Sequence, residues 1–440
     1  MCPYLYIAEV FSRLAYVEPM QELNSDQQSA LELLKGKENI FLTGAAGSGK
    51  SFLLREYLKG KDIPILASTG AAAILVAGRT FHSFFGLGIM EGGVEATVKR
   101  ASKNKKLMKR IRQYSEIVID EVSMLSGPTL RAAELIAKHA LSSLAPWGGL
   151  RVIVVGDFSQ LPPVNPFSRQ KEWAFQDPVW EESRFTPVIL KKIMRSSDVE
   201  FLEILRRIRH GVLDDSVTEF LDSRVKVKPT GDFTRLFPHR ADVDNYNFQQ
   251  LQEINHEVHT FTTVYSGKEA DIERFRKHSP IADVIHLKKD ALVMIRQNDP
   301  VGRWVNGSLG RIQKISDESL KIKLDGGRTI DLEKAEFTLL DADGNPAVSA
   351  TNFPITLAWA MTIHKAQGAT LDQMHVDLRK IWEPGQTYVA LSRVRSPQGL
   401  FIEGWSKSSI FSDRDVFAFH KSLVASSSLG SDEASAVTDA

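Results

Sequence analysis

The chain has 440 residues, of which 43% are hydrophobic and 25% charged, so it has room for about two to four folded domains. Its formal net charge of +1 excludes a strongly basic nucleic-acid binder, although a local basic stretch still permits that partner. A single cysteine excludes an internal disulfide, and no apolar run approaches the roughly 18 residues of a membrane span.

Short apolar runs alternate with helical patterns along the first half of the chain. Buried parallel strands covered by helices show this pattern, so we expect a doubly wound α/β domain. The expected strands are NIFLTG (39–44), IPILAS (63–68), EIVID (116–120) and LRVIVVGD (150–157). A second set follows, with TPVILK (186–191), TRLFPH (234–239), PITLAWA (354–360), MHVDL (374–378) and GLFIEG (399–404).

A different pattern interrupts the second set. Residues 290–332 form short apolar runs joined by turns, and Asp325-Gly326-Gly327 is a strong hairpin signal. We therefore expect a small all-β module inserted in a second α/β domain. The last stretch, 422–440, is small, polar and acidic, which is typical of a disordered tail.

GAAGSGKS (44–51) lies between an expected strand and an expected helix, and it matches G-x-x-x-x-G-K-[ST]. Backbone N–H groups and the helix dipole favour a phosphate at such a place, although an ordinary turn is the alternative. The residues expected to contact ATP are Gly44, Ala45, Ala46, Gly47, Ser48, Gly49, Lys50 and Ser51. Lys50 would neutralise the β- and γ-phosphates, and the Ser51 hydroxyl would hold Mg²⁺.

A second candidate group follows the strands EIVID and LRVIVVGD. Asp120 is suited to hold Mg²⁺, and Glu121 to orient and deprotonate an attacking water. Gln160 in GDFSQLPPV (156–164) is expected at the same sheet edge, where an amide senses the γ-phosphate or the water. A solvated strand end and a plain loop residue are the alternatives for the acidic pair and for Gln160.

These stretches, in this order, resemble superfamily 1 helicases, and most closely the PIF family, in the subgroup that also holds RecD-like enzymes. The other stretches that carry the resemblance are LNSDQQSAL (23–31), STGAAAILVAGRTFHSF (68–84), PWGGLRVIVVGDFSQLPPV (146–164), RSSDVEFLEILRRIRHG (195–211), MTIHKAQGATLD (361–372) and YVALSRVRS (388–396). One departure is Trp147, where the family more often has Phe.

The resemblance implies an α/β fold of two RecA-like P-loop domains with ATP between them. In such a cleft Gln27 reads adenine, Gln367 and Gly368 lie near ATP, and Arg195 and Arg393 stabilise charge on the γ-phosphate. The implied segments are an N-terminal segment 1–23, a first domain 24–189 with a wedge insertion at about 86–114, a second domain 190–261 and 351–421, an SH3-like β-barrel insertion 262–350, and the tail 422–440.

The resemblance also implies single-stranded DNA across both domains, and duplex or fork DNA as the substrate. The candidate contacts are Thr69, Gly70, Phe81 and His82 in the first domain, and His239, Arg240, Asn247, Thr362 and His364 in the second. Phe84 and Phe85 are equally compatible with the core. In the barrel, Arg303 and Trp304 are further candidates, beside the turn residues Asn306 and Gly307.

The stretch VKRASKNKKLMKRIRQ (98–113) is basic and contains no acid. It falls in the expected wedge, so we expect it to contact duplex DNA, with a solvated surface as the alternative.

The function expected from these features is an ATP-driven, Mg²⁺-dependent 5′-to-3′ DNA helicase. We expect a monomer inside the cell, in the cytoplasm and at the nucleoid in a bacterium, with no membrane partner. Two alternatives stay open: a translocase that strips proteins from a single strand, and a single-strand-binding module with a vestigial nucleotide site. The presence of Lys50, Glu121 and Arg393 disfavours the second alternative.

Overall fold

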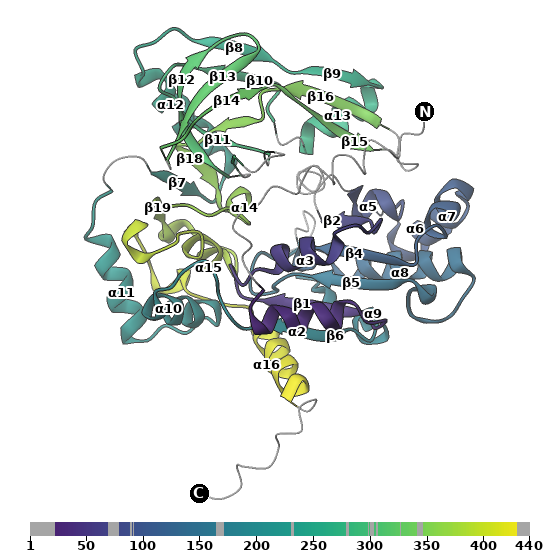
Figure 1. Ribbon diagram of the computed structural model, residues 1–440. Coiled ribbons are helices and arrows are strands. Elements are labelled where there is room, and N and C mark those ends of the chain that lie inside the picture. Colours follow the sequence, from purple (N-terminus) through teal and green to yellow (C-terminus); the bar gives the residue numbers. More distant parts are fainter. Residues whose placement is uncertain are drawn as a thin grey trace, which may run out of the picture.

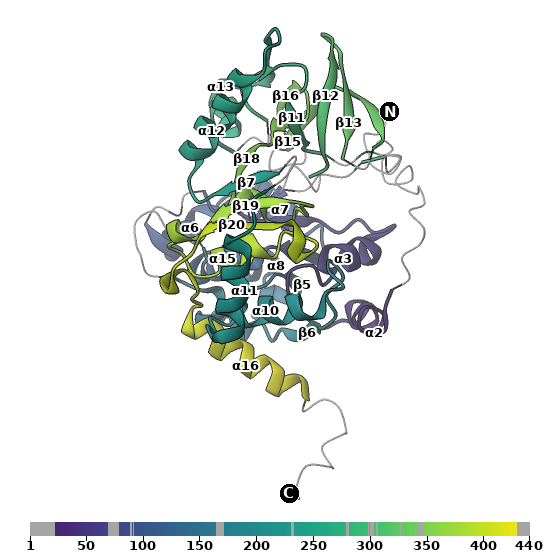
Figure 2. The same cartoon turned by 90° about the vertical axis from the view of Figure 1, so that its left-hand side faces the viewer.

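The computed structural model describes residues 23–68, 79–88, 90, 92–163, 171–229, 233–278, 281–297, 299, 303–304, 307–325, 327–340 and 346–428. These residues form two α/β lobes, each built on a parallel sheet, and a β-rich part that lies above both lobes in Figure 1. Figure 2 shows the same arrangement from the side of the second lobe.

The first lobe contains a six-stranded parallel sheet with the order β3-β2-β4-β5-β1-β6. Its strands are β1 (Ile40–Gly44), β2 (Ile65–Ala67), β3 (Arg79–Thr80), β4 (Glu116–Asp120), β5 (Arg151–Val155) and β6 (Thr186–Leu190). All five residues of β1 are buried, because helices cover both faces of the sheet. The doubly wound domain predicted from the apolar runs is confirmed.

The helices of the first lobe lie on both faces of this sheet. They are α2 (Ser25–Leu34), α3 (Lys50–Leu58), α5 (Phe81–Phe84), α6 (Gly93–Ser102), α7 (Lys105–Ile111), α8 (Gly127–Leu141) and α9 (Pro178–Glu182), with 3-10 turns η1 (Val122–Met124), η2 (Pro146–Gly149) and η3 (Ala174–Gln176). Helices α6 and α7 occupy the stretch expected to form a wedge, and both pack on α8. Trp147 is fully buried, and its indole N–H donates to Ser183 Oγ at 2.8 Å. Trp147 therefore fits at a position where the family more often has Phe, because its buried indole N–H has a hydrogen-bond acceptor.

The second lobe contains a four-stranded parallel sheet with the order β18-β7-β19-β20. The strands are β7 (Thr234–Phe237), β18 (Ala360–Thr362), β19 (Met374–Asp377) and β20 (Leu400–Gly404). The helices are α10 (Val199–Arg209), α11 (Asp215–Val225), α12 (Arg240–Glu253), α14 (Ile363–Ala366), α15 (Gln386–Leu391) and α16 (Arg414–Ser428), with η4 (Leu378–Lys380), η5 (Pro397–Gly399) and η6 (Lys407–Ser409).

The β-rich part consists of antiparallel strands in three sheets, with the orders β14-β13-β12-β11-β17, β15-β16-β9 and β10-β8. Its elements are β8 (His259–Thr262), β9 (Val264–Gly267), α13 (Glu269–His278), β10 (Val284–Leu287), β11 (Leu292–Ile295), β12 (Leu309–Ile315), β13 (Ser319–Leu324), β14 (Thr329–Glu333), β15 (Ala335–Leu340), β16 (Pro346–Asn352) and β17 (Ile355–Leu357). The predicted hairpin joins β13 to β14. The single strand predicted at 354–360 is wrong, because this run divides between β17 of the β-rich part and β18 of the second lobe.

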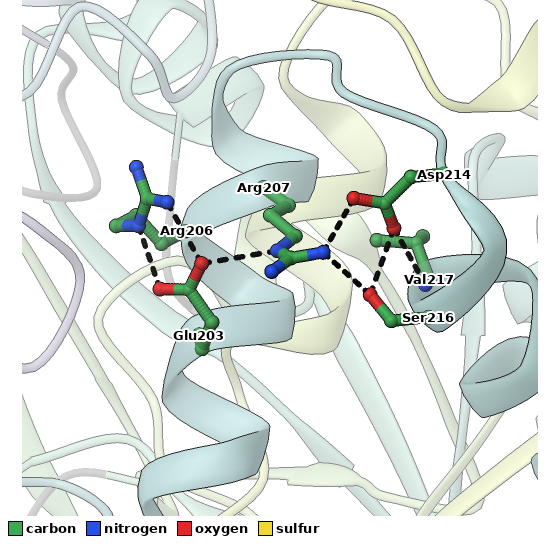
Figure 3. Close-up of polar contacts among 6 residues, drawn as sticks. All are labelled: Glu203, Arg206, Arg207, Asp214, Ser216 and Val217. Carbon is green, nitrogen blue, oxygen red and sulfur yellow. Dashed lines mark hydrogen bonds and ion pairs between the residues drawn. The ribbon is translucent and has the colours of Figure 1, made fainter.

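Helix α10 is held within the second lobe by an apolar face and by a polar network. Its residues Phe201, Ile204, Leu205 and Ile208 share one face and are all buried. Figure 3 shows the polar network at the opposite side, which joins α10 to α11. In this network Arg207 Nε donates to Glu203 Oε1 at 3.0 Å, Arg207 also pairs with Asp214, and Asp214 accepts from the Val217 N–H at 3.0 Å as the N-cap of α11.

Helix α16 leaves the second lobe and packs on the first lobe, below β6 in Figure 1. Phe419 stacks on Phe175, with ring centroids 4.3 Å apart and an interplanar angle of 10°. Trp173 Nε1 donates to Asp413 Oδ2 at 3.1 Å, just before α16 begins. The predicted tail beginning at 422 is therefore wrong for 422–428, which belong to α16, and 429–440 lie outside the described residues.

Candidate functional site

The phosphate loop (44–51) leads from the end of β1 into α3. Gly47 and Gly49 have φ angles of 79° and 89°, which glycine adopts without strain. A Cβ on Gly47 would lie 2.6 Å from Arg195 Cβ, and one on Gly49 would lie 2.5 Å from Gln27 Nε2. Arg195 and the buried Gln27 therefore flank the loop directly.

The start of α3 leaves polar groups open to a ligand. The first intrahelical bond runs from the Leu53 N–H to Gly49 O at 2.9 Å, so the N–H groups of the first turn have no acceptor within the helix. Ser48 Oγ is buried and has no hydrogen-bond partner among the described residues, while Ser51 is exposed. This end of α3 fits an anion such as a phosphate.

Lys50 supplies the cation of the loop. Its Nζ donates to the backbone oxygens of Gly44 at 2.8 Å and Ala45 at 3.1 Å. Desolvation lowers the pKa of Lys50, whereas the charges of Asp157 and Glu121 act in the opposite direction. The ammonium therefore lies between the loop and the carboxylates.

The acidic pair lies where β4 ends. Glu121 has a left-handed backbone with φ of 54°, a strained conformation for a residue with a side chain, and its N–H donates to Asp120 Oδ1 at 2.9 Å. Its Oε2 accepts a hydrogen bond from Gln367 Nε2, at 3.0 Å. Desolvation first, and then the charge of Asp120, raise the pKa of Glu121 to about 7. Desolvation also raises the pKa of Asp120.

Asp157 is a buried carboxylate between the two lobes. Its Oδ1 accepts from Arg209 Nη2 at 2.8 Å, and its Oδ2 from Gln160 Nε2 at 3.4 Å. Burial would raise the pKa of Asp157, but the charges of Arg209 and Lys50 outweigh it and lower the pKa to about 2. Gln160 is thus held by a carboxylate of its own loop, and α10 of the second lobe is tied to the first.

The two predicted arginines meet at Ser392. Arg195 Nη1 donates to Ser392 O at 2.6 Å and its Nε to Thr370 Oγ1 at 3.2 Å. Arg393 is fully buried, with Nη2 donating to Ser392 Oγ at 2.7 Å. Burial first, and then the charge of Arg195, lower the pKa of Arg393 to about 9. The structure thus brings both guanidinium groups to the loop and the acidic pair.

Sequence reasoning missed three residues of this cleft: Asp157, Arg209 and Tyr388, whose phenolic oxygen accepts the Ala46 N–H of the phosphate loop. Each lies inside a stretch that carried the family resemblance, so the signal was present without a role attached to the position. Gly368, predicted near ATP, has a φ of 81° and is exposed directly after Gln367.

The nucleic-acid candidates of the first lobe divide into three cases. Thr69 and Gly70 lie outside the described residues. Phe81 is fully buried in the core with Phe84 and Phe85, so its prediction as a DNA contact is corrected: the ring has no free face on which a base can stack. His82 is partly buried, and burial lowers its pKa.

On the second lobe, Thr362 and His364 lie at the start of α14. The Thr362 hydroxyl accepts the Lys365 N–H at 3.1 Å as the N-cap, and Thr362 is 8% exposed. His364 is partly buried, and burial lowers its pKa. Helix α14 therefore carries His364 at one end and leads into Gln367, which bonds Glu121 in the nucleotide cleft.

The prediction for Asn247 is corrected. Its Nδ2 donates to Ala360 O at 2.9 Å and its Oδ1 accepts the Ala360 N–H at 2.8 Å, so the buried amide is fully used in holding β18. Arg240, in contrast, is exposed at the start of α12, where it pairs with Asp244 at 3.6 Å.

His239, a predicted DNA contact, forms an aromatic surface near the end of β7 with Trp382, which was not predicted. His239 is exposed and stacks on Trp382, with ring centroids 5.8 Å apart and an interplanar angle of 18°. Trp382 is 52% exposed, and among the described Phe, Tyr and Trp residues only Phe248 is more exposed. An exposed aromatic pair of this kind is a platform on which a nucleic-acid base stacks.

The basic stretch 98–113 is only partly a free surface. The arginines Arg100, Arg110 and Arg112 donate to the backbone oxygens of Leu87, Phe84 and Ala140, each at 2.6 Å. These three arginines are therefore bound to the backbone of the first lobe. Lys99, Lys103, Lys105 and Lys109 are exposed.

The predicted DNA contacts of the β-rich part also differ in their positions. Trp304 is 6% exposed, so its prediction as a DNA contact is corrected to a core position beneath the Arg303 guanidinium, which lies 4.6 Å from its ring. Arg303 pairs with Asp299 at 2.7 Å. Asn306 lies outside the described residues, and Gly307 donates its N–H to Ile295 O.

In the part of the chain that the structure describes, no helix combines the length and the apolar character that crossing a bilayer requires. No group of three or more His, Cys, Asp or Glu side chains there has the arrangement of a metal centre.

A phosphate loop at the end of a parallel strand, faced by arginines next to a second parallel sheet, defines a nucleotide-binding protein with two RecA-like lobes. The chain belongs to the PIF1-like helicase family. The family model, described as PIF1-like helicase, matches residues 22–219. ATP-dependent DNA helicase Pif1 from Bdellovibrio bacteriovorus is 49% identical over 404 residues, which cover 91% of this chain and 92% of that protein.

Two other relatives show how much of the chain the similarity covers. ATP-dependent DNA helicase PIF1 from Emericella nidulans is 34% identical, and the match covers 89% of this chain but 62% of that protein. Pif1 from Bacteroides sp. in complex with ADP-AlF4 has a TM-score of 0.79 at 28% identity, with 92% of this chain and 98% of that chain covered. With ADP-AlF3 and single-stranded DNA bound, the Bacteroides protein gives a TM-score of 0.66. The lobes and the β-rich part of this chain are therefore arranged more like those of the ADP-AlF4 complex than those of the complex with single-stranded DNA.

Proposed function

We propose that this protein is an ATP-dependent DNA helicase that moves 5′ to 3′ along single-stranded DNA and unwinds the duplex ahead of it. The family and the named activity of its relatives support this proposal, as does the Bacteroides structure with ADP-AlF3 and single-stranded DNA. The observation that carries it is the 3.0 Å bond from Gln367 Nε2 to Glu121 Oε2. It connects a segment that begins with a DNA-side candidate, His364, to the carboxylate proposed to activate water.

The residues present fit ATP and Mg²⁺. The first turn of α3 offers N–H groups without an acceptor in the helix, the loop offers Lys50, and Gln27 lies beside the loop for the base. Mg²⁺ prefers oxygen ligands, which the exposed Ser51 hydroxyl and the Asp120 carboxylate supply. When bound, Mg²⁺ offsets phosphate charge.

Glu121 is suited to accept a proton from the attacking water, because a pKa of about 7 matches the working pH. Gln367 holds one of its oxygens and so orients the other. Arg195 and Arg393 lie ready to stabilise charge that develops on the γ-phosphate. Their bonds to Ser392 bind them to the second lobe, so their position relative to the loop changes when the lobes move.

Movement along DNA requires that the affinity of each lobe for DNA changes when the cleft opens and closes. His82 in the first lobe, and Thr362, His364 and the His239–Trp382 pair in the second, are the proposed contacts. We also propose that the protein works as a monomer, and that a bacterial cell holds it at the nucleoid because it binds DNA.

The test is the rate of phosphate release from ATP with and without a single-stranded oligonucleotide. We expect DNA to stimulate release by the full-length protein. Lys50→Ala and Glu121→Gln should both abolish the stimulated rate, but Glu121→Gln should still bind ATP. The exposed pair Lys35 and Glu32 supplies matched controls, since Lys35→Ala and Glu32→Gln change the same charges at the surface. A DNA-independent rate, or full activity of Glu121→Gln, contradicts the proposal.

A further inference from the structure

Arg296 is a buried cation with no counter-ion in the part of the chain that the structure describes. It directly follows β11 and is 8% exposed. Its backbone N–H donates to Pro354 O at 2.7 Å. Among the described residues its guanidinium reaches only Met294 Sδ, at 3.8 Å, and its Nε has no partner. Throughout the described residues, no carboxylate lies within ion-pair distance of it.

A buried guanidinium without an acceptor is costly, because it has lost water and gained little in return. Most buried charges in proteins are paired for this reason. The rest of the Arg296 environment is a strand end, where β11 pairs with β17. No described residue in this packing uses the positive charge, so the charge is suited to an anion that comes from outside the chain.

The surroundings of Arg296 are positive. Lys365 of α14 is exposed, and its side chain makes no hydrogen bond or ion pair with the described residues. Desolvation, and then the charges of Arg296 and Arg240, lower the pKa of Lys365, while Asp244 acts in the opposite direction. Asp244 is the one acid in this group and is already paired with Arg240. The three cations therefore attract an anion to the place where the β-rich part joins the second lobe.

We propose that Arg296 and Lys365 bind a phosphodiester group of the single-stranded DNA. This inference rests on the proposed function. A planar guanidinium with free N–H groups matches phosphate oxygens, and it gains most where water is excluded. Lys365 directly follows His364, so the bound strand passes from α14 of the second lobe to the end of β11 in the β-rich part.

The first test compares Arg296→Met with Arg296→Lys and with Arg328→Met, which removes an exposed charge of the same β-rich part. The measurement is the dissociation constant for a fluorescein-labelled oligothymidylate at several salt concentrations. We expect Arg296→Met to bind about tenfold more weakly, and its slope of log affinity against log salt to fall by about 0.7. Arg296→Lys should recover part of the affinity, and Arg328→Met should bind like the wild type.

The second readout separates binding from folding. Without DNA, Arg296→Met should unfold at the wild-type temperature or above it, because an unpaired buried charge is removed. Unchanged DNA affinity in Arg296→Met overturns the proposal, whatever the unfolding temperature. Failure of the wild type to bind the oligonucleotide contradicts the proposed function instead.

A third experiment tests the phosphate contact itself, and it is needed if Arg296→Met loses both stability and DNA affinity. This experiment uses a series of oligomers that are just long enough to fill the site. In each oligomer one phosphodiester is replaced by a neutral methylphosphonate linkage, at a different position along the strand. The wild type should lose affinity at one position where Arg296→Met loses nothing further, since the contact is already gone. If both proteins respond alike at every position, the phosphate contact of Arg296 is wrong.

Discussion

The phenolic oxygen of Tyr388 accepts a hydrogen bond from the backbone N–H of Ala46 at 2.8 Å. Tyr388 belongs to α15 of the second lobe and is 3% exposed, whereas Ala46 lies in the phosphate loop of the first lobe. Burial raises the pKa of Tyr388 to about 12, so the phenol stays neutral. Because loop N–H groups are those that contact phosphates, this bond competes with a nucleotide for the same donor.

Tyr388→Phe should therefore tighten ATP binding in the absence of DNA. Removal of the phenolic oxygen leaves the buried Ala46 N–H without an acceptor until a phosphate arrives, and one such bond is worth about 1 kcal/mol, or about fivefold in affinity. The measurement is a titration with a fluorescent ATP analogue. Weaker binding by Tyr388→Phe would show that the tyrosine assists the nucleotide rather than competing with it.

Arg393→Ala should lower the maximal turnover about a thousandfold but change ATP affinity by less than about tenfold, because a cleft arginine acts mostly in the transition state. Arg395→Ala is the matched control, since Arg395 is exposed and pairs with the exposed Asp372 at 3.0 Å. Steady-state phosphate release and ATP titration give the two quantities. A loss confined to affinity contradicts the assignment of Arg393.

Replacing the exposed Lys99, Lys103, Lys105 and Lys109 by Gln should weaken unwinding and its salt dependence. Stimulation of hydrolysis by single-stranded DNA should remain, because these lysines are proposed to contact the duplex. Parallel strand-displacement and phosphate-release assays compare the two activities. Equal loss of both would place α6 and α7 on the single strand instead.

His420 makes stability depend on pH. It faces Asp157, Arg209 and His210, and burial followed by the charge of Arg209 lowers its pKa to about 4. The unfolded chain binds the proton near pH 6.5, so the stabilisation is complete above that pH and is lost as the pH falls towards 4. Between pH 7 and pH 5 the loss is about 2 kcal/mol.

His420→Gln should therefore reduce the difference between the thermal unfolding temperatures at pH 7 and pH 5. The wild type is the reference, because other histidines contribute to its own pH dependence, among them His375 with a pKa lowered to about 4. An unchanged difference would show that His420 is not neutral in the folded protein.

Local patterns in the sequence were sufficient for the parallel strands and the phosphate loop. EIVID coincides with β4, and GAAGSGKS joins β1 to α3, because apolar runs and turn glycines are local signals. The helix α16 that crosses to the first lobe was not predicted, since nothing local in 414–428 indicates which lobe it contacts.

The errors in the candidate site have the same origin. Phe81, Asn247 and Trp304 carry side chains that suit nucleic-acid binding, but the fold buries them, and burial depends on residues distant in sequence. Trp382 was missed for the converse reason: its exposure and its stacking on His239 exist only in the folded chain.

Strand displacement on three substrates tests the central claim most directly. With ATP and Mg²⁺, the protein should unwind a fluorescent duplex that bears a 5′ single-stranded tail, and it should fail on a 3′ tail and on a blunt end. Preference for the 3′ tail would contradict the proposed direction. No displacement on any substrate, together with strong DNA-stimulated hydrolysis, would contradict unwinding itself and favour a translocase on single-stranded DNA.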